Sequence, residues 1–349
     1  MKHPTSAGEP VGVSPWTAST TCPGADAGRL TNSVFAATRV IRLLLVALLV
    51  GSHPASAADS AMVIGVNDCP KYRLPNGSRP RPLKGAESDA DAMANCLIER
   101  FGFSKDNVRI LKGEQATRQS VLRALEQIQK TLKAGDRCVL HFSGHGTQVP
   151  DQKPFDERDD GLDEALCLSD SDEQGNNLLL DDELGRWLDD LPEVDVTVIL
   201  DCCHAGTGVK DADDDVQARF LPTTALRPVR GEPIAPWKDL RPNTKGTGCR
   251  LTAIYACQPH EQAYERRFGD GDQARRAGQF THFLLDAITN RQADQDSDGR
   301  ITNEEALRFA TERLDTSFNR QRSERAAQQH PQLESMTKKQ PLFGIMPRT

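Results

Sequence analysis

The sequence has few aromatic side chains, no excess of positive charge and no regular cysteine framework. Aromatic residues make up 5% of the 349 residues, so the core must be built from Leu, Val, Ile and Ala. The formal net charge of -7 argues against binding nucleic acid through a broad basic face. The nine cysteines contain no C-x-x-C pair, and no His/Cys set has the ligand spacing of a metal-dependent hydrolase. These absences also exclude a small disulfide-dense domain.

Residues 1–57 are predicted to be a leader and signal peptide. Arg39 and Arg42 precede the apolar run Leu43–Val50, and Ala55-Ser56-Ala57 supplies a small-x-small cleavage site. The run is shorter than a membrane-spanning helix requires. The alternatives to a cleaved signal peptide are an uncleaved anchor and a buried helix. We expect a secreted or periplasmic protein with no stable membrane insertion after cleavage. The rest of the chain then carries about -9, which is compatible with cationic substrates or divalent cations.

Strand and helix patterns alternate after residue 58, which predicts an α/β fold with a mostly parallel sheet and helices on both faces. Short apolar runs predict strands at 61–66, 108–111, before His145, before Cys203, at 251–256 and at 341–345. Apolar spacing and caps predict helices at 86–101, 117–132, 182–188, 279–290 and 303–314. Residues 208–248 lose the pattern and are predicted to form one long exposed loop.

Two predicted strands end in residues that carry chemistry. One run ends with His145 between two glycines, and another ends with Cys203 behind Asp201. Either residue alone is more often structural. Because adjacent parallel strands bring their carboxyl ends to the same edge of a sheet, we expect the thiol and the imidazole to meet there. A cysteine with a nearby histidine predicts a nucleophile and its base, and therefore a cysteine peptidase.

Three segments resemble motifs of the caspase-like (C14-type) peptidases, closest to the metacaspases and their bacterial relatives. They are Leu83–Ala90, which has Ser88 where the family usually has Asn, Ser143–Gly146 and Asp201–Gly206. The residues that flank Cys203 match the family pattern and pick it, rather than Cys202, as the nucleophile. Within this resemblance, His145 is the general base, and the N–H groups of Gly146 and Cys203 are the expected oxyanion donors.

The resemblance covers about residues 61–345. It implies a caspase-like three-layer sandwich in which 58–349 is the peptidase domain. The parts are 58–207, which is large-subunit-like, a linker loop at 208–248, and 249–349, which is small-subunit-like. It also implies a monomer that needs no organic cofactor. An alternative of another class is a catalytically silent, calcium-binding caspase-like scaffold, against which the intact Cys203 and His145 argue.

The resemblance further implies proteins or peptides with a basic P1 residue as substrates. Asp89 and Asp201 match positions that line an acidic pocket for Arg or Lys in metacaspases, where a carboxylate pair can hold a guanidinium. The plainer alternative is that Asp201 caps a helix and Asp89 is solvated. The linker 208–248 contains basic residues at which such an enzyme could cut itself, among them Lys210, Arg219, Arg227, Arg230, Lys238 and Lys245.

Two acidic clusters predict calcium binding. Asp163, Asp181 and Asp182 resemble the family's calcium ligands, with Asp160 as a spare, although a solvated acidic loop is a rival interpretation. Residues 294–305 match a twelve-residue EF-hand loop. Its candidate ligands are Asp294, Asp296, Asp298, Arg300 at the position that uses a backbone carbonyl, and Glu305. This segment could instead only cap the following helix.

Overall fold

The computed structural model describes residues 59–150, 162–203, 215–223, 249–271, 274–289, 291–322, 327–335 and 339–344. The predicted leader and signal peptide, and most of the predicted linker, lie outside these ranges. None of the helices in the described ranges combines the length and apolar character that crossing a membrane requires.

A six-stranded sheet with the order β12-β9-β7-β3-β1-β2 forms the centre of the fold. Its members are β1 (Ser60–Gly65), β2 (Val108–Lys112), β3 (Arg137–Ser143), β7 (Asp195–Asp201), β9 (Arg250–Tyr255) and β12 (Gln332–Ser335). Five strands are parallel to one another, and only β12, at the edge, runs antiparallel. The prediction of a mostly parallel sheet is therefore confirmed.

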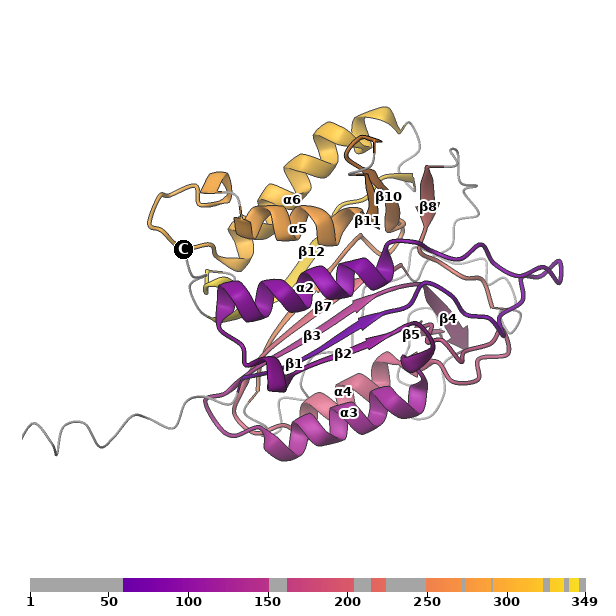
Figure 1. The fold of residues 1–349 in the computed structure, drawn as a ribbon, viewed down its shortest axis with the longest axis horizontal. Helices are drawn as coiled ribbons and strands as arrows, with labels where there is room; N and C mark the ends of the chain where they lie inside the picture. Colours follow the sequence, from indigo (N-terminus) through magenta and orange to yellow (C-terminus); the bar gives the residue numbers. More distant parts are fainter. Residues whose placement is uncertain are drawn as a thin grey trace, which may run out of the picture. The chain divides into compact units, whose positions relative to one another are not determined.

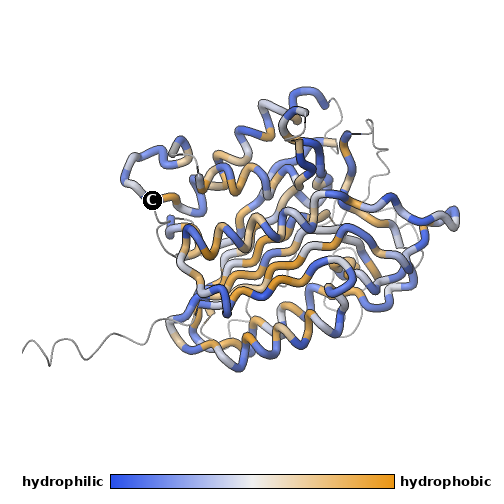
Figure 2. The backbone as a smooth tube through the Cα atoms, viewed as in Figure 1, coloured by the Kyte–Doolittle hydropathy of each residue, from blue (hydrophilic) through white to orange (hydrophobic). Residues whose placement is uncertain are grey.

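Helices cover both faces of this sheet, as Figure 1 shows. The helices α3 (Arg118–Thr131) and α4 (Asp181–Asp189) pack on one face, and α2 (Ala86–Phe101), α5 (Gln279–Thr289) and α6 (Asn303–Ser317) pack on the other. Alternate strand residues serve the two cores, as the period of a strand requires. In β1, Met62 and Ile64 join the core under α3, whereas Ala61 and Val63 join the core under α2. The apolar stripes of the strands are visible in Figure 2.

Two small antiparallel sheets carry most of what the sequence pattern missed. One consists of β4 (Gly146–Pro150), β5 (Leu162–Leu166) and β6 (Leu179–Leu180). The other consists of β11 (Arg275–Gly278), β10 (Tyr264–Phe268) and β8 (Val216–Ala218). Strand β8 lies inside the segment predicted to be one exposed loop, so that prediction is wrong for residues 216–223, most of which are buried.

The strand predicted at 341–345 is also wrong for the residues described there. Leu342–Gly344 form a 3-10 turn in which Phe343 has a positive φ of 55°. Phe343 instead packs its ring edge-on against Phe101, with ring centroids 4.8 Å apart. The strand that completes the sheet is β12, in a polar stretch where apolar alternation gives no signal.

Candidate active site

The ends of β3 and β7 place His145 and Cys203 at neighbouring positions. The two strands are paired up to Ser143 and Asp201, and the N–H of Gly144 then donates to the carbonyl of Asp201 at 3.3 Å. His145 lies two residues beyond the last pair on one strand, and Cys203 lies two residues beyond it on the other. Both side chains are buried.

The backbone at these two strand ends converges on one carbonyl group, that of Arg219. Its oxygen accepts the N–H of Gly146 at 2.9 Å and the N–H of Cys203 at 3.4 Å. Two N–H groups that share one carbonyl oxygen beside a thiol form the arrangement of an oxyanion hole. The peptide bond between Arg219 and Phe220 therefore occupies this site.

The segment that leads to Arg219 is bound as an added strand. β8 pairs antiparallel with β10, with Ala218 opposite Tyr264 and Val216 opposite Arg266. The N–H of Arg219 continues the ladder by donating to the carbonyl of Ala263 at 2.9 Å. Addition of a strand to a sheet edge is a common way for a protein to bind an extended peptide. Residues 216–219 thus lie as a peptide substrate would.

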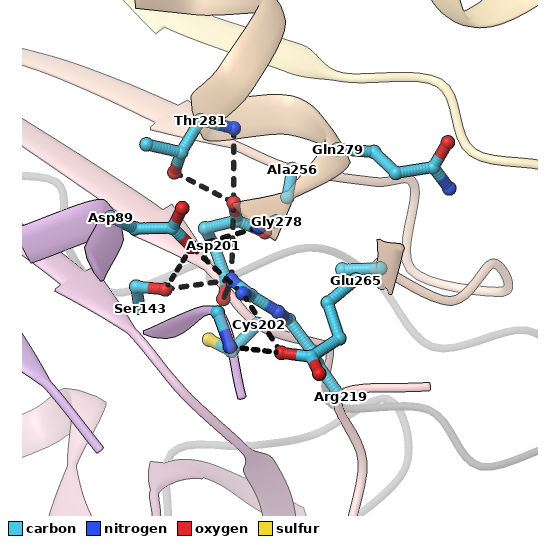
Figure 3. Close-up of polar contacts among 12 residues, drawn as sticks. Asp89, Ser143, Asp201, Cys202, Arg219, Ala256, Glu265, Gly278, Gln279 and Thr281 are labelled. Carbon is cyan, nitrogen blue, oxygen red and sulfur yellow. Dashed lines mark hydrogen bonds and ion pairs between the residues drawn. The ribbon is translucent and has the colours of Figure 1, made fainter. Parts of the chain in front are cut away.

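The guanidinium of Arg219 is completely buried in an acidic pocket (Figure 3). Its Nη2 lies 2.8 Å from Asp89 and 3.7 Å from Glu265, and its Nη1 lies 3.2 Å from the carboxylate of Asp201. Nη1 also donates to the hydroxyl of Ser143 at 2.7 Å and to the carbonyl of Asp201 at 3.1 Å. The pocket is therefore shaped for a flat cation with several donors.

Backbone N–H groups hold the three carboxylates in place. Asp89 accepts from Gly278 at 2.9 Å, and Asp201 accepts from Thr281 at 3.0 Å. Glu265 accepts from Lys84 and Gly85, both at 2.9 Å. Each carboxylate is therefore held by a main-chain donor as well as by the guanidinium.

Gly278 leaves the room that the guanidinium needs. A Cβ at this position would lie 2.2 Å from the Asp201 carboxylate and 2.4 Å from Nη1 of Arg219. Both distances are far below van der Waals contact, so only glycine fits beside an occupied pocket.

Three carboxylates surround one cation, so the pocket keeps an excess of negative charge. Burial raises the pKa of Asp89 to about 6, and the neighbouring Asp201 adds to this rise, while Arg219 offsets it only in part. Burial disfavours the charged guanidinium, but Asp201, Asp89 and Glu265 outweigh it and raise the pKa of Arg219. An arginine is the side chain best able to stay charged at such a depth.

With the pocket filled, burial favours the neutral forms of the cysteine and the histidine. It raises the pKa of the Cys203 thiol to about 12 and lowers the pKa of His145 to about 3, where the charge of Arg219 contributes. Neither ring nitrogen of His145 has a hydrogen-bond partner among the described residues. The imidazole is therefore neutral while the pocket is filled, and no third residue orients it in the part of the chain that the structure describes.

Sequence reasoning named some of these residues and missed others. His145, Gly146 and Cys203, and the acidic pair Asp89 and Asp201, are brought together at one site. Arg219 was predicted only as one of several possible self-cleavage positions. The remaining members were not predicted as site residues: Ser143, Glu265, Gly278 and Thr281. The apolar pair Phe220–Leu221 in a polar segment was the one signal for Arg219, and an acidic residue within a short strand was the signal for Glu265.

The EF-hand-like loop 294–305 brings several of its candidate ligands together. Carboxylate oxygens of Asp294, Asp296 and Glu305 lie within 4.8 Å of one another, the only group of three or more such side chains among the described residues. Asp298 lies outside that group and accepts the N–H of Arg300 at 2.7 Å. The donor set of hard oxygens fits Ca²⁺.

Glu305 has a second role that the sequence analysis kept open. It forms a capping box with Thr302 at the start of α6, in which its carboxylate accepts the N–H of Thr302 at 3.0 Å. This box satisfies the first turn of the helix without a metal ion. Ligand and cap are therefore compatible roles for the same side chain.

The other acidic candidates do not form a three-ligand group among the described residues. Asp163 lies on β5, and Asp181 and Asp182 begin α4 directly after β6. Ala165 and Leu180 are paired across β5 and β6, so the three carboxylates belong to one small sheet and its edge. The spare candidate, Asp160, lies outside the described residues.

Comparison with known proteins finds a match to most of the described region. A family model described as the caspase domain matches residues 58–342. Metacaspase-4 of Arabidopsis thaliana is 34% identical over 140 residues, which are 38% of this chain and 32% of the relative. Metacaspase-1 of Arabidopsis thaliana is 34% identical over 188 residues, 50% of this chain and 47% of the relative. Metacaspase-1A of Aspergillus oryzae is 32% identical over 157 residues, 43% of this chain and 35% of the relative.

The chain thus matches less than half of the length of these curated relatives. Among solved structures, a crystal structure of a protein from Geobacter sulfurreducens is similar, with a TM-score of 0.54 and 25% sequence identity. The match covers 82% of this chain and 99% of that chain.

Proposed function

The chain belongs to the caspase domain family, and we propose that it is a cysteine endopeptidase that cleaves after Arg or Lys. The observation that carries the proposal is the position of Arg219. A basic side chain lies in an acidic pocket while its own carbonyl oxygen accepts from the N–H groups of Gly146 and Cys203. This is the geometry that a P1 arginine needs for attack by a neighbouring thiol.

In the proposed reaction, the Cys203 sulfur attacks the carbonyl carbon while its proton passes to His145. The oxyanion that forms is held by the N–H groups of Gly146 and Cys203. The C–N bond then breaks, and His145 gives the proton to the departing amine. This leaves a thioester between Cys203 and the P1 residue. Water hydrolyses the thioester, and the carboxylate product leaves with the free thiol restored.

The pocket supports a preference for Arg over Lys. Arg219 uses both terminal nitrogens at once, one toward Asp89 and the other toward Ser143 and Asp201. A lysine ammonium is a single point charge and cannot reach both sides of the pocket in this way.

We further propose that the first bond cleaved is the one between Arg219 and Phe220 in the same chain. Until this bond is cut, the segment fills the site to which other substrates must bind. The intact chain is then latent, and its release depends on its own Cys203.

Cleavage of fluorogenic peptides tests the proposed activity. Peptides with Arg, Lys or Asp at P1 are given to the wild-type chain and to Cys203→Ala, with calcium and with a chelator. We expect the wild-type chain to cleave Arg peptides faster than Lys peptides and not to cleave Asp peptides. Cys203→Ala should cleave none of them. Cleavage after Asp would overturn the acidic pocket, and no turnover at all would favour the non-catalytic calcium-binding scaffold.

We also propose that calcium stimulates the enzyme by binding the loop 294–305. The support is the cluster of Asp294, Asp296 and Glu305. Two variants separate the metal site from the cap: Glu305→Gln keeps an acceptor for the cap but removes the ligand charge, and Thr302→Val removes the cap hydroxyl but leaves the carboxylates. We expect calorimetry to show a loss of calcium binding only for Glu305→Gln. Equal calcium binding by both variants would contradict the site.

Export remains part of the proposal, supported by the sequence of residues 39–57 alone. Mass spectrometry of the native protein should find an N-terminus at Ala58. A chain that keeps the Leu43–Val50 run in the purified native protein would contradict cleavage.

A further inference from the structure

The segment after the bond at Arg219 is bound as closely as the segment before it. Phe220 forms a parallel bridge with Gly146, the first residue of β4. The N–H of Gly146 donates to the Arg219 carbonyl, and its own carbonyl accepts the N–H of Leu221, both at 2.9 Å. One residue of β4 therefore aligns the chain on both sides of the bond to be cleaved.

Two buried hydroxyl groups bind the main chain beyond Phe220. The carbonyl of Leu221 accepts from the hydroxyl of Thr147 at 2.6 Å, and the carbonyl of Pro222 accepts from the hydroxyl of Tyr72 at 3.1 Å. Thr147 and Tyr72 are both completely buried. These two hydroxyls therefore hold a main chain that continues along β4.

The side chain of Leu221 is 2% exposed and belongs to the same apolar core cluster as Tyr72 and Val149. Its neighbours Phe220 and Pro222 are only partly buried. This alternation puts Arg219, Leu221 and Thr223 on the enzyme side of an extended chain. The enzyme thus encloses the second residue after the bond and leaves the first more open.

We propose a primed-side subsite in which Tyr72, Gly146 and Thr147 hold the main chain, while the apolar cluster around Leu221 selects a bulky aliphatic residue at P2′, the second position after the cleaved bond. The inference rests on the proposed function and extends it. The substrates are then polypeptides in which a basic residue is followed, two places later, by Leu or a residue of similar size. An apolar pocket of this kind discriminates by size, and about tenfold or more separates Leu from Ala.

Peptide substrates test this without altering the protein. Internally quenched peptides with the sequence of residues 216–223 carry Leu, Met, Ala or Asp at the Leu221 position and are given to the wild-type full-length chain after it has released the Phe220 N-terminus. A fluorogenic Val-Gln-Ala-Arg amide, which has no primed residues, is assayed in parallel, and Cys203→Ala is the blank. We expect kcat/KM to be at least about tenfold lower for Ala than for Leu, with Met close to Leu and Asp lowest.

The outcomes separate the subsite from the proposed activity. Cleavage of the fluorogenic amide together with Leu and Ala peptides that agree within about twofold would overturn the subsite and leave the peptidase intact. No cleavage of any of them would overturn both. A second measurement is made in cis: Leu221→Ala should slow the appearance of the Phe220 N-terminus, and Leu221→Met should restore it. Equal rates for Ala and Met in a folded chain would contradict the subsite.

Discussion

Replacing Arg219 by glutamine should slow self-cleavage of the chain by about 10²-fold. Glutamine keeps an amide of similar reach but removes the charge that the pocket is built around. In the wild type, the guanidinium meets the carboxylates of Asp89 and Asp201 at 2.8 and 3.2 Å, without exposure to water. Removing one partner of a buried ion pair costs about 3–5 kcal/mol, because the remaining charge is left unpaired.

The lower end of that range applies here, because the pKa of Asp89 is already raised to about 6 and this carboxyl can take up a proton. About 3 kcal/mol corresponds to roughly two factors of ten. This free energy destabilises only the state in which residues 216–223 are bound at the site. The fraction of molecules in that state, and with it the rate of self-cleavage, therefore falls. The self-cleavage rate of Arg219→Lys should lie between those of the wild type and Arg219→Gln, since the ammonium keeps the charge but cannot contact both sides of the pocket.

The assay follows the full-length chain over time by denaturing gel and identifies the new N-terminus by mass spectrometry. Wild type should produce a fragment that begins at Phe220, and Cys203→Ala should produce none. Arg227→Gln is the matched control, because it removes another basic residue of the same linker, and its rate should equal the wild-type rate. Cleavage of Arg219→Gln before Phe220 at the wild-type rate would refute the reasoning, as would a first cut elsewhere in the linker.

Three further outcomes follow from the structure. The pKa of Asp89 is about 6 with Arg219 in the pocket, and the guanidinium lowers it, so Asp89 in the emptied pocket takes up a proton at a higher pH. KM for Arg peptides should therefore rise by up to about tenfold per pH unit as the pH falls toward 6, and level off below it. The same pH series with Asp89→Asn should give a flat KM profile, and an unchanged slope would exclude Asp89. Gly278→Ala should abolish cleavage of Arg peptides while circular dichroism stays native, since its Cβ would meet the pocket atoms at 2.2 and 2.4 Å, and retained cleavage would contradict this geometry. Thr117→Ala should lower the free energy of unfolding by about 1 kcal/mol in urea, because the Thr117 side chain accepts the N–H of Ser120 at the start of α3, and an unchanged midpoint would show that the cap is dispensable.

The sequence was most informative where burial imposes an apolar pattern, which is a near-continuous run in a strand covered on both faces and a period in a helix. The apolar runs of β1, β3, β7 and β9 serve two cores, so they mark the positions of these strands. The helix predicted at 86–101 has the bounds observed for α2. The edge strand β12 has only one strand neighbour and half-buried side chains, so it carries no such period.

The catalytic residues that the sequence predicted are likewise those that follow strongly apolar strands. His145 and Cys203 follow strongly apolar strands, and strand pairing carries them to one edge. Arg219 was one of seven basic residues in a segment without period, and only the apolar pair Phe220–Leu221 that follows it distinguishes it locally from Arg227 or Arg230. Its role comes from contacts across long sequence separations, with Asp89 on one side and Glu265 on the other. Such long-range contacts are set by tertiary packing, which local patterns do not encode.

The enclosure of the Arg219–Phe220 bond within its own chain has a consequence for reaction order. When a bond is held at the nucleophile of the same molecule, its cleavage has a rate constant that does not depend on the protein concentration. On the proposed self-cleavage, conversion of the latent chain is therefore first order, and dilution does not slow it. Low abundance would give a cell no protection against conversion. Control must come from a condition that acts on each molecule separately, and the proposed binding of calcium to the loop 294–305 is such a condition.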